Sequence, residues 1–254
     1  MLYRIKIWIR VLYSLILTFP GVMCKVLDAE DTVQKIREGK SLIRFGDGEF
    51  GIYNGKSIHY QQFSDDLKNK FEEIKSFFEI EGENCPYLLA VPKKYMQCTG
   101  FALCKKRVLV SSWAEARNYF KKNFNLNKTY GDAFLFERKN VSIYENIWNA
   151  KNDSRTIIFI HNNRIYAEQF QKKYKREVLF IQCPTQNAFE QIEKLENDIN
   201  NLIALHNLGK ENVQIVVSAG PTGKILVYQF SRKGYHSIDA GHCWDDPLES
   251  EYNV

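Results

Sequence analysis

Two carboxylates on alternate residues, each preceded by glycine, are the strongest sign of chemistry in this chain. They are Asp47 and Glu49 in the stretch Arg44-Phe45-Gly46-Asp47-Gly48-Glu49, which follows the apolar residues Leu42-Ile43. On an extended chain alternate side chains point to the same side, so one divalent cation could contact both carboxylates. The glycines would let a bulky ligand approach the backbone. The pattern predicts a site for a metal and a phosphate; the alternative is a polar turn.

A second stretch, Ser218-Ala219-Gly220-Pro221-Thr222-Gly223, predicts an anion contact. It follows an apolar run and precedes a helical pattern, so backbone N–H groups at the helix start would be available to a diphosphate. The spacing is not that of a Walker A loop. Ordinary turn formation before a helix is the alternative explanation.

The elements that must position these residues alternate between strands and helices. Strand-like apolar runs occupy 41–45, 87–91, 155–160, 177–181, 213–217 and 237–239, and helical patterns occupy 29–38, 64–80, 112–123, 142–150, 164–173, 187–206 and 220–233. This alternation predicts an α/β fold with a mostly parallel sheet covered by helices on both faces. Ligands bind such sheets at the carboxyl ends of the strands, so we expect four loops to converge there: 46–49, 183–187, 218–223 and 239–244.

Composition fits one domain that binds an anionic partner. The 254 residues are 44% hydrophobic, and no linker or repeat divides them, so we expect one compact unit over 26–254. The net charge of +5 is spread out, which argues against a dedicated nucleic-acid binder. The six cysteines form no C-x-x-C pair, so neither a zinc site nor a disulfide framework is indicated, and reduced thiols in the cytoplasm fit best.

Residues 1–25 are predicted to form a separate amphipathic helix. On a helix Lys6, Arg10, Ser14 and Thr18 form a narrow polar stripe on an apolar cylinder. The uninterrupted apolar run 11–19 is short for a membrane span of about 20 residues. We expect residues 1–24 to contact a membrane surface or a partner, which would place the protein peripherally on the inner face of the membrane. A buried packing helix and a signal or anchor are the alternatives.

Six short blocks occur in an order that resembles the GT-D-fold glycosyltransferases, a family earlier catalogued as DUF1792. The similarity covers residues 28–244, and the blocks are Arg44–Glu49, Glu115–Asn118, Tyr130–Phe134, Cys183-Pro184 with Asn187–Phe189, Gly220–Thr222, and Asp239–His242. The stretch His161–Arg164 departs from the pattern, which has a small and acidic turn there.

The resemblance implies a Rossmann-like sheet of GT-D type and a transferase that uses a nucleotide-sugar donor, with UDP favoured. It places the enzyme in bacterial polysaccharide or glycoprotein assembly, with a glycan, a lipid-linked glycan or a glycoprotein as acceptor. It also implies a D-x-E motif that holds a divalent metal, usually manganese, and Asp47 and Glu49 match that motif. Magnesium accepts the same oxygen ligands.

The remaining site residues follow from these blocks and loops. Donor contacts are expected from Arg44, Phe45, Gly46, Gly48, Arg117, Pro184, Asn187, Gly220, Pro221 and Thr222. An inverting transfer needs a base for the acceptor hydroxyl proton, and the candidates are Asp132, Asp239 and His242. Asp132 is preferred because Gly131 and aromatic residues flank it, and turn closure is the alternative role.

Two other functions remain open at this point. A metal-dependent phosphohydrolase or nucleotidyltransferase would also need carboxylates beside a phosphate-binding helix start, although such enzymes usually bring more metal ligands than this chain offers. A non-catalytic nucleotide-binding scaffold on the membrane would bind nucleotide without turnover.

Overall fold

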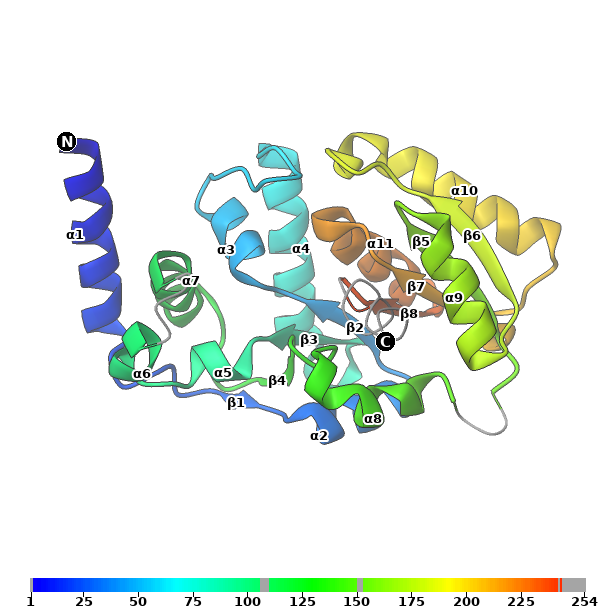
Figure 1. Cartoon of the computed structure of the whole chain (residues 1–254), viewed down its shortest axis with the longest axis horizontal. Helices are drawn as coiled ribbons and strands as arrows, with labels where there is room; N and C mark the ends of the chain where they lie inside the picture. Colours follow the sequence, from blue (N-terminus) through cyan, green and yellow to red (C-terminus); the bar gives the residue numbers. More distant parts are fainter. Residues whose placement is uncertain (1, 106–109, 150–152, 242, 244–254) are drawn as a thin grey trace, which may run out of the picture.

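The protein is an α/β sandwich with one sheet between two layers of helices (Figure 1). The computed structural model describes residues 2–105, 110–149, 153–241 and 243. Within these residues eight strands pair in parallel in the order β1-β4-β3-β2-β8-β7-β5-β6. The strands are β1 (Lys25–Val26), β2 (Ser41–Arg44), β3 (Tyr87–Val91), β4 (Thr129–Asp132), β5 (Thr156–His161), β6 (Val178–Gln182), β7 (Val213–Val217) and β8 (His236–Asp239). The predicted fold class is confirmed.

Alternate residues of the buried strands face opposite helical layers, as the two-residue period of a strand requires. Ile158 and Ile160 of β5 belong to one apolar cluster, whereas Ile157 and Phe159 belong to the other. The first layer holds α3 (Asp47–Tyr53), α4 (Asp65–Glu81), α7 (Val110–Asn123), α10 (Ile192–Leu205) and α11 (Gly220–Arg232). The second holds α2 (Ala29–Arg37), α8 (Val141–Tyr144) and α9 (Arg164–Tyr174).

The last strand, β8, lies in the middle of the sheet, between β2 and β7. Ile238 pairs with Leu42 on one side and with Val216 on the other. Among the strands that the structure describes, the half-sheet of β1 to β4 is therefore hydrogen-bonded to the half-sheet of β5, β6 and β7 through β8.

Most predicted elements are found within a few residues of their expected bounds, and the differences lie in the loops. Residues 45–49 do not continue β2 as an extended chain, because α3 begins at Asp47. Strands β1 and β4 and the short helices α5 (Lys93–Met96) and α6 (Gly100–Lys105) were not predicted. The helix expected over 142–150 is divided into α8 and a 3-10 turn, Glu145–Ile147, and residue 150 is outside the described residues.

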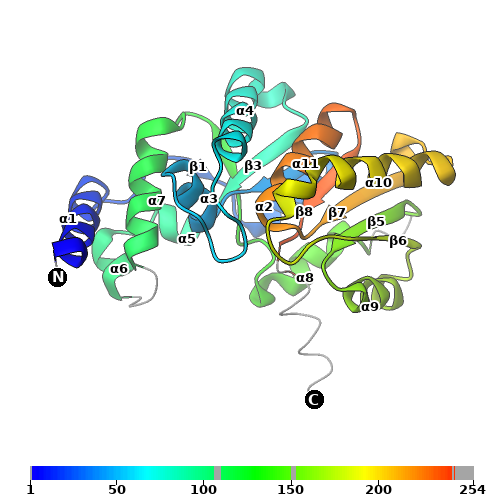
Figure 2. The same cartoon turned by 90° about the horizontal axis from the view of Figure 1, so that it is seen from above.

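The predicted N-terminal helix exists as α1 (Leu2–Leu17) and packs against α7 at one end of the molecule (Figures 1 and 2). Its predicted polar stripe is split. Ser14 and Thr18 are buried against the protein, whereas Lys6 and Arg10 are exposed. Within the described residues no helix is long and apolar enough to span a membrane.

Candidate functional site

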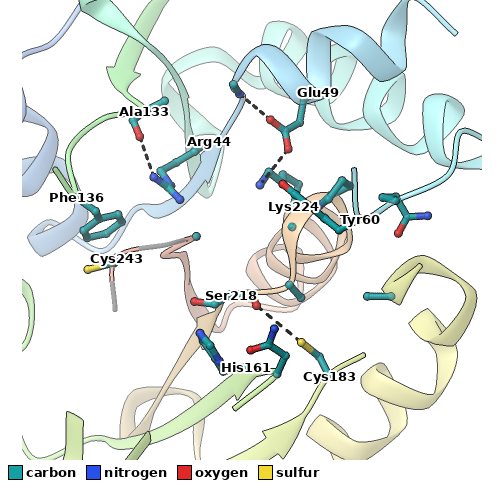
Figure 3. A pocket seen from close by; sticks show the side chains of 18 of the residues that line it. Arg44, Glu49, Tyr60, Ala133, Phe136, His161, Cys183, Ser218, Lys224 and Cys243 are labelled. Carbon is teal, nitrogen blue, oxygen red and sulfur yellow. Dashed lines mark hydrogen bonds and ion pairs between the residues drawn. The ribbon is translucent and has the colours of Figure 1, made fainter. Parts of the chain in front are cut away.

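A cavity of about 470 Å³ opens at the carboxyl edge of the sheet (Figure 3). Its volume is in the range of small-molecule sites, which is about 300–1,000 Å³. Residues at or just after the ends of β2, β4, β5, β6, β7 and β8 line it, and α11 contributes Lys224. All four loops expected at this edge supply lining residues, so the predicted convergence is confirmed.

Lys224 is the central charged group of the cavity wall. Its Nζ lies 3.2 Å from Glu49 Oε1 and 3.2 Å from Asp239 Oδ2, and the lysine is only 5% exposed. Burial lowers the pKa of the Lys224 ammonium, but the carboxylates of Asp239 and Glu49 outweigh burial and raise it above its ordinary value. The lysine is therefore charged. It was not predicted, although it sits one turn into the helix that follows Gly220-Pro221.

Arg44 ties three strand ends together beside this lysine. Its Nε donates to the Asp239 carbonyl (2.8 Å) and its Nη1 donates to the Ala133 carbonyl (2.9 Å). Its guanidinium also lies over the Phe136 ring, 5.2 Å from the centroid. Gly241 has a φ of +56°, and a Cβ there would lie 1.8 Å from Arg44 Nη2, so this position requires glycine. Arg44 thus lines the cavity with two of its five guanidinium N–H donors bound to carbonyl groups.

The Asp-x-Glu pair does not have the predicted geometry. Gly46 is the N-cap of α3, and its N–H donates to Glu49 Oε2 (2.7 Å) while Glu49 Oε1 faces Lys224. Two residues apart on a helix means a rotation of about 200°, so the side chains of Asp47 and Glu49 diverge. Glu49 lines the cavity, and Asp47 is not among its lining residues. The extended-chain prediction is wrong because the strand ends at Arg44.

The donor set does not fit a cation shared by Asp47 and Glu49. Both Glu49 oxygens already have partners, and one of those partners is itself a cation. Among the described residues no group of three or more His, Cys, Asp or Glu side chains could hold a metal. Dependence on manganese or magnesium stays a prediction from the resemblance.

The start of α11 forms a second polar wall. Ala219 is its N-cap and supplies no capping side chain, Pro221 has no N–H, and residues 218–221 line the cavity. Gly220 has a φ of +53°, and a Cβ there would lie 2.5 Å from the Tyr60 ring, so glycine lets Tyr60 close over this turn. The positive end of the helix dipole is therefore turned toward the cavity, as an anion site requires.

Six of the predicted site residues line the cavity: Arg44, Gly46, Glu49, Pro184, Gly220 and Pro221. Several others do not. The Phe45 ring is fully buried against Phe50 and Phe71, so its side chain cannot stack on a nucleotide. Thr222 is fully buried too, in a helix whose residues 221–228 are all buried.

Three further predictions are corrected by the positions of the side chains. Arg117 is fully buried between α7 and α1, where it donates to the Thr18 carbonyl, so it is not a phosphate contact. Asn187 Oδ1 accepts the Gln62 backbone N–H (2.8 Å) and so links two loops, and Asn187 is not among the residues that line the cavity. Gly48 lies within α3 and packs near Ile58 instead of lining the cavity.

Two of the three candidate bases, Asp132 and Asp239, are not among the residues that line the cavity. Asp132 Oδ1 accepts the N–H groups of Phe134 (3.0 Å) and Lys93 (3.2 Å), so it closes the turn after β4. Burial raises the pKa of Asp132, although these two bonds oppose the shift. Asp239 is fully buried beneath Lys224. His242 lies outside the described residues.

His161 is a cavity residue that sequence reasoning did not assign. Its Nδ1 accepts the Asn163 N–H (3.0 Å), so the neutral ring carries its proton on Nε2 and acts as a donor. It sits in the turn that departs from the family pattern, and its place at the end of β5 was the available signal.

The fold and the site define a member of a known family of sugar-transferring enzymes. The family model for the GT-D glycosyltransferase fold matches residues 42–253, so the chain belongs to this family. It is 21% identical over 238 residues to a probable glycosyl transferase Gly of Streptococcus gordonii, covering 85% of this chain and 31% of that protein. It is 24% identical over 256 residues to the glycosyltransferase GlyD of Streptococcus pneumoniae, covering 92% and 28%. The chain thus spans about a third of the length of these curated relatives.

Solved structures show the same fold. A domain of unknown function 1792 superposes with a TM-score of 0.73 at 20% identity, covering 91% of this chain and 83% of that one. A glycosyltransferase (DUF1792) from Streptococcus sanguinis superposes with a TM-score of 0.69 at 21% identity, covering 91% and 86%. Helix α1 lies before the region that the family model matches.

Proposed function

We propose that this protein transfers a sugar from a nucleoside diphosphate donor, with UDP as the favoured nucleotide, to a glycan, a lipid-linked glycan or a glycoprotein. The observation that carries the proposal is the cavity at the carboxyl edge, where the Lys224 ammonium and the uncapped start of α11 line one enclosed space. Membership of the GT-D family supports the class of reaction, and we propose bacterial polysaccharide or glycoprotein assembly as its setting.

The reaction fits these groups. The bond between the anomeric carbon and the diphosphate oxygen breaks, and its electron pair stays on that oxygen. The acceptor hydroxyl oxygen bonds to the anomeric carbon, and the hydroxyl proton leaves to solvent or to a base. Negative charge grows on the diphosphate, so prearranged positive groups in a low-dielectric site lower the barrier. Lys224 and the first turn of α11 are the groups so placed.

Nucleotide binding tests this proposal directly. We expect the melting temperature of the purified protein to rise with one family of nucleoside diphosphates or diphosphate sugars in a panel, and a matching acceptor-dependent release of nucleoside diphosphate. Release of inorganic phosphate or sugar phosphate without an acceptor would instead favour the phosphohydrolase. Binding with no turnover toward any acceptor preparation would favour the scaffold.

We also propose that α1 binds an anionic membrane surface on the cytoplasmic side. The helix turns its buried polar residues toward α7 and its apolar residues toward solvent: Ile5, Trp8, Ile9, Leu12, Tyr13 and Ile16 are all exposed, with Trp8 at 60% and Ile16 at 71%. No acidic residue occurs before Asp28, and the exposed Lys6 and Arg10 share this helix. Apolar and aromatic side chains beside basic ones are the composition of an interfacial helix.

Vesicle binding checks the membrane proposal. The full chain should cosediment with vesicles of phosphatidylcholine and phosphatidylglycerol more than with phosphatidylcholine alone, and Leu12→Ser with Ile16→Ser should abolish the difference. Leu205→Ser on α10 removes an equally exposed apolar side chain (78%) and serves as the control. Equal partitioning of the double variant and wild type would contradict the proposal.

A further inference from the structure

The cavity already contains a cation where the family pattern leads one to expect a metal ion. The Lys224 ammonium is equidistant from two carboxylates on different elements, Glu49 at the start of α3 and Asp239 at the end of β8. Figure 3 shows its Nζ pointing from α11 to the Glu49 carboxylate at the cavity wall. A divalent cation at this point would have to displace the ammonium.

The remaining contacts of the two carboxylates fix this arrangement. Glu49 Oε2 accepts the backbone N–H of Gly46. Asp239 Oδ2 faces Lys224 and also accepts the backbone N–H of Arg44 at 3.1 Å. Asp239 Oδ1 has no hydrogen-bond partner among the described residues and lies 3.7 Å from Arg44 Nη2. Two carboxylates therefore balance one ammonium and one guanidinium, and the cluster is neutral before any ligand enters.

We propose that Lys224 is the resident cation of the donor site and that Glu49 is its positioning residue instead of a metal ligand. The inference rests on the proposed function, because it takes a nucleoside diphosphate as the ligand. When the donor is bound, the ammonium turns one of its three N–H donors to the diphosphate and keeps its carboxylate contacts with the others. The positive charge that stabilises the leaving group is thus part of the chain itself.

Manganese binding to the protein alone separates this proposal from the proposed function, since it needs no nucleotide. We expect electron paramagnetic resonance to show no bound Mn²⁺ in the wild type. Lys224→Met should gain a site, because it leaves two carboxylates without their cation, and adding Glu49→Gln should remove that site. Lys233→Met, at the C-cap of the same helix and paired with the half-buried Glu196, is the matched control and should gain nothing.

Binding of UDP in the presence of EDTA is the second readout. Wild-type affinity should be the same within about twofold with manganese and with EDTA. Lys224→Met should lose about ten- to a hundredfold in EDTA, the usual effect of removing a hydrogen bond to a charged group, and Lys233→Met should match the wild type. A wild-type affinity that collapses in EDTA would overturn the proposal while leaving the nucleotide site, and thus the proposed function, intact.

Glu49→Gln in the wild-type background keeps the test valid if Lys224→Met does not fold. Asp239 still balances Lys224 in this variant. If Glu49 is a metal ligand, the wild type binds Mn²⁺ and Glu49→Gln abolishes that binding, which would overturn the proposal. Under the proposal there is no Mn²⁺ binding to lose, and UDP affinity in EDTA falls only through the displaced lysine.

Discussion

The two ends of the parallel sheet both hold clusters of charged side chains, but the clusters are built for different purposes. At the carboxyl end Lys224 contacts two carboxylates and still lines the cavity. At the amino end Asp153 accepts two hydrogen bonds from the Arg155 guanidinium (2.9 and 3.0 Å), one from the Arg155 backbone N–H (3.1 Å) and one from Arg176 (3.0 Å). Here the side chains of Arg155 and Arg176 donate to other members of the cluster and to nearby carbonyl groups.

His236 makes the contrast clear because it lies on the same strand as Asp239. Its Nδ1 meets the donors of Arg155 (2.8 Å) and Gln214 (2.9 Å), and its Nε2 donates to the Lys40 carbonyl (3.1 Å). Burial lowers the pKa of His236 to about 4, with the Arg155 charge acting in the same direction. The amino end thus keeps its titratable ring neutral, whereas the carboxyl end keeps its lysine charged. Asp153, Arg155 and His236 also line a cavity, of about 500 Å³, so it is the charged lysine beside a helix start, and not a cavity alone, that distinguishes the carboxyl end as a ligand site.

The largest effect should come from the carboxyl end. Lys224→Met leaves Glu49 and Asp239 buried without their shared cation, and breaking a buried ion pair costs about 3–5 kcal/mol. We expect that loss in the free energy of unfolding measured by urea denaturation at pH 7. A loss below 1 kcal/mol would mean that water reaches these carboxylates freely.

Acid should weaken the amino end next. The pKa of His236 is about 4 in the folded state, whereas an unfolded histidine titrates near 6.5. Between these pH values the unfolded state therefore binds a proton that the folded state does not bind. Stability is lost as the pH falls from about 6.5 to about 4, by up to roughly 3 kcal/mol. Comparing wild type with His236→Gln at pH 7 and pH 4.5 isolates the effect, since only the wild type has this titration. Equal pH dependence in both proteins would disprove it.

Arg176→Met sharpens the comparison because it should affect stability alone. Arg176 donates to Asp153 and to the carbonyl groups of Trp148 and Arg155, and it is buried. Asp153 keeps Arg155, so the expected cost is about 1.5–3 kcal/mol, less than for Lys224→Met. UDP affinity should equal that of the wild type. A tenfold loss of affinity would show that the two ends are coupled.

The smallest effect should come from a charge outside both clusters. Lys233 pairs with Glu196 at 2.7 Å, and the lysine side chain is 44% exposed. Exposed pairs of this kind contribute about 0–1 kcal/mol. Lys233→Met should therefore leave urea denaturation and UDP affinity nearly unchanged, and a larger change would weaken its use as a control.

Sequence reasoning succeeded where the pattern is local and failed where it depends on contacts between distant segments. The strand over 87–91 and the helix before Gly39 can be predicted from their local residue patterns. Together such patterns predicted the parallel sheet and its binding edge. The Glu49–Lys224 pair joins residues that no spacing rule relates. A carboxylate three residues after Gly46 is also a helix-start signal, and weighing it against strand alternation would have predicted α3.

The predicted phosphate contact of Arg117 was wrong for a similar reason. A polar residue on a predicted helix is expected in solvent or at a ligand, and only the packing of α1 on α7 explains its burial. The same contact leaves apolar side chains of α1 exposed and buries only the Ser14 and Thr18 end of its predicted polar stripe.

The central position of β8 has a consequence for how the protein reaches its native state. Residues 236–239 come late in the chain, yet β2 and β7 each expose an unpaired edge until they arrive. Contacts that close loops of nearly 200 residues form slowly, and open strand edges invite pairing between chains. Asp239 enters the site on that same strand. A nascent or nicked chain without β8 would therefore have two half-sheets with unpaired strand edges, and it would lack a complete donor site. Aggregation and loss of function should therefore begin at the same step.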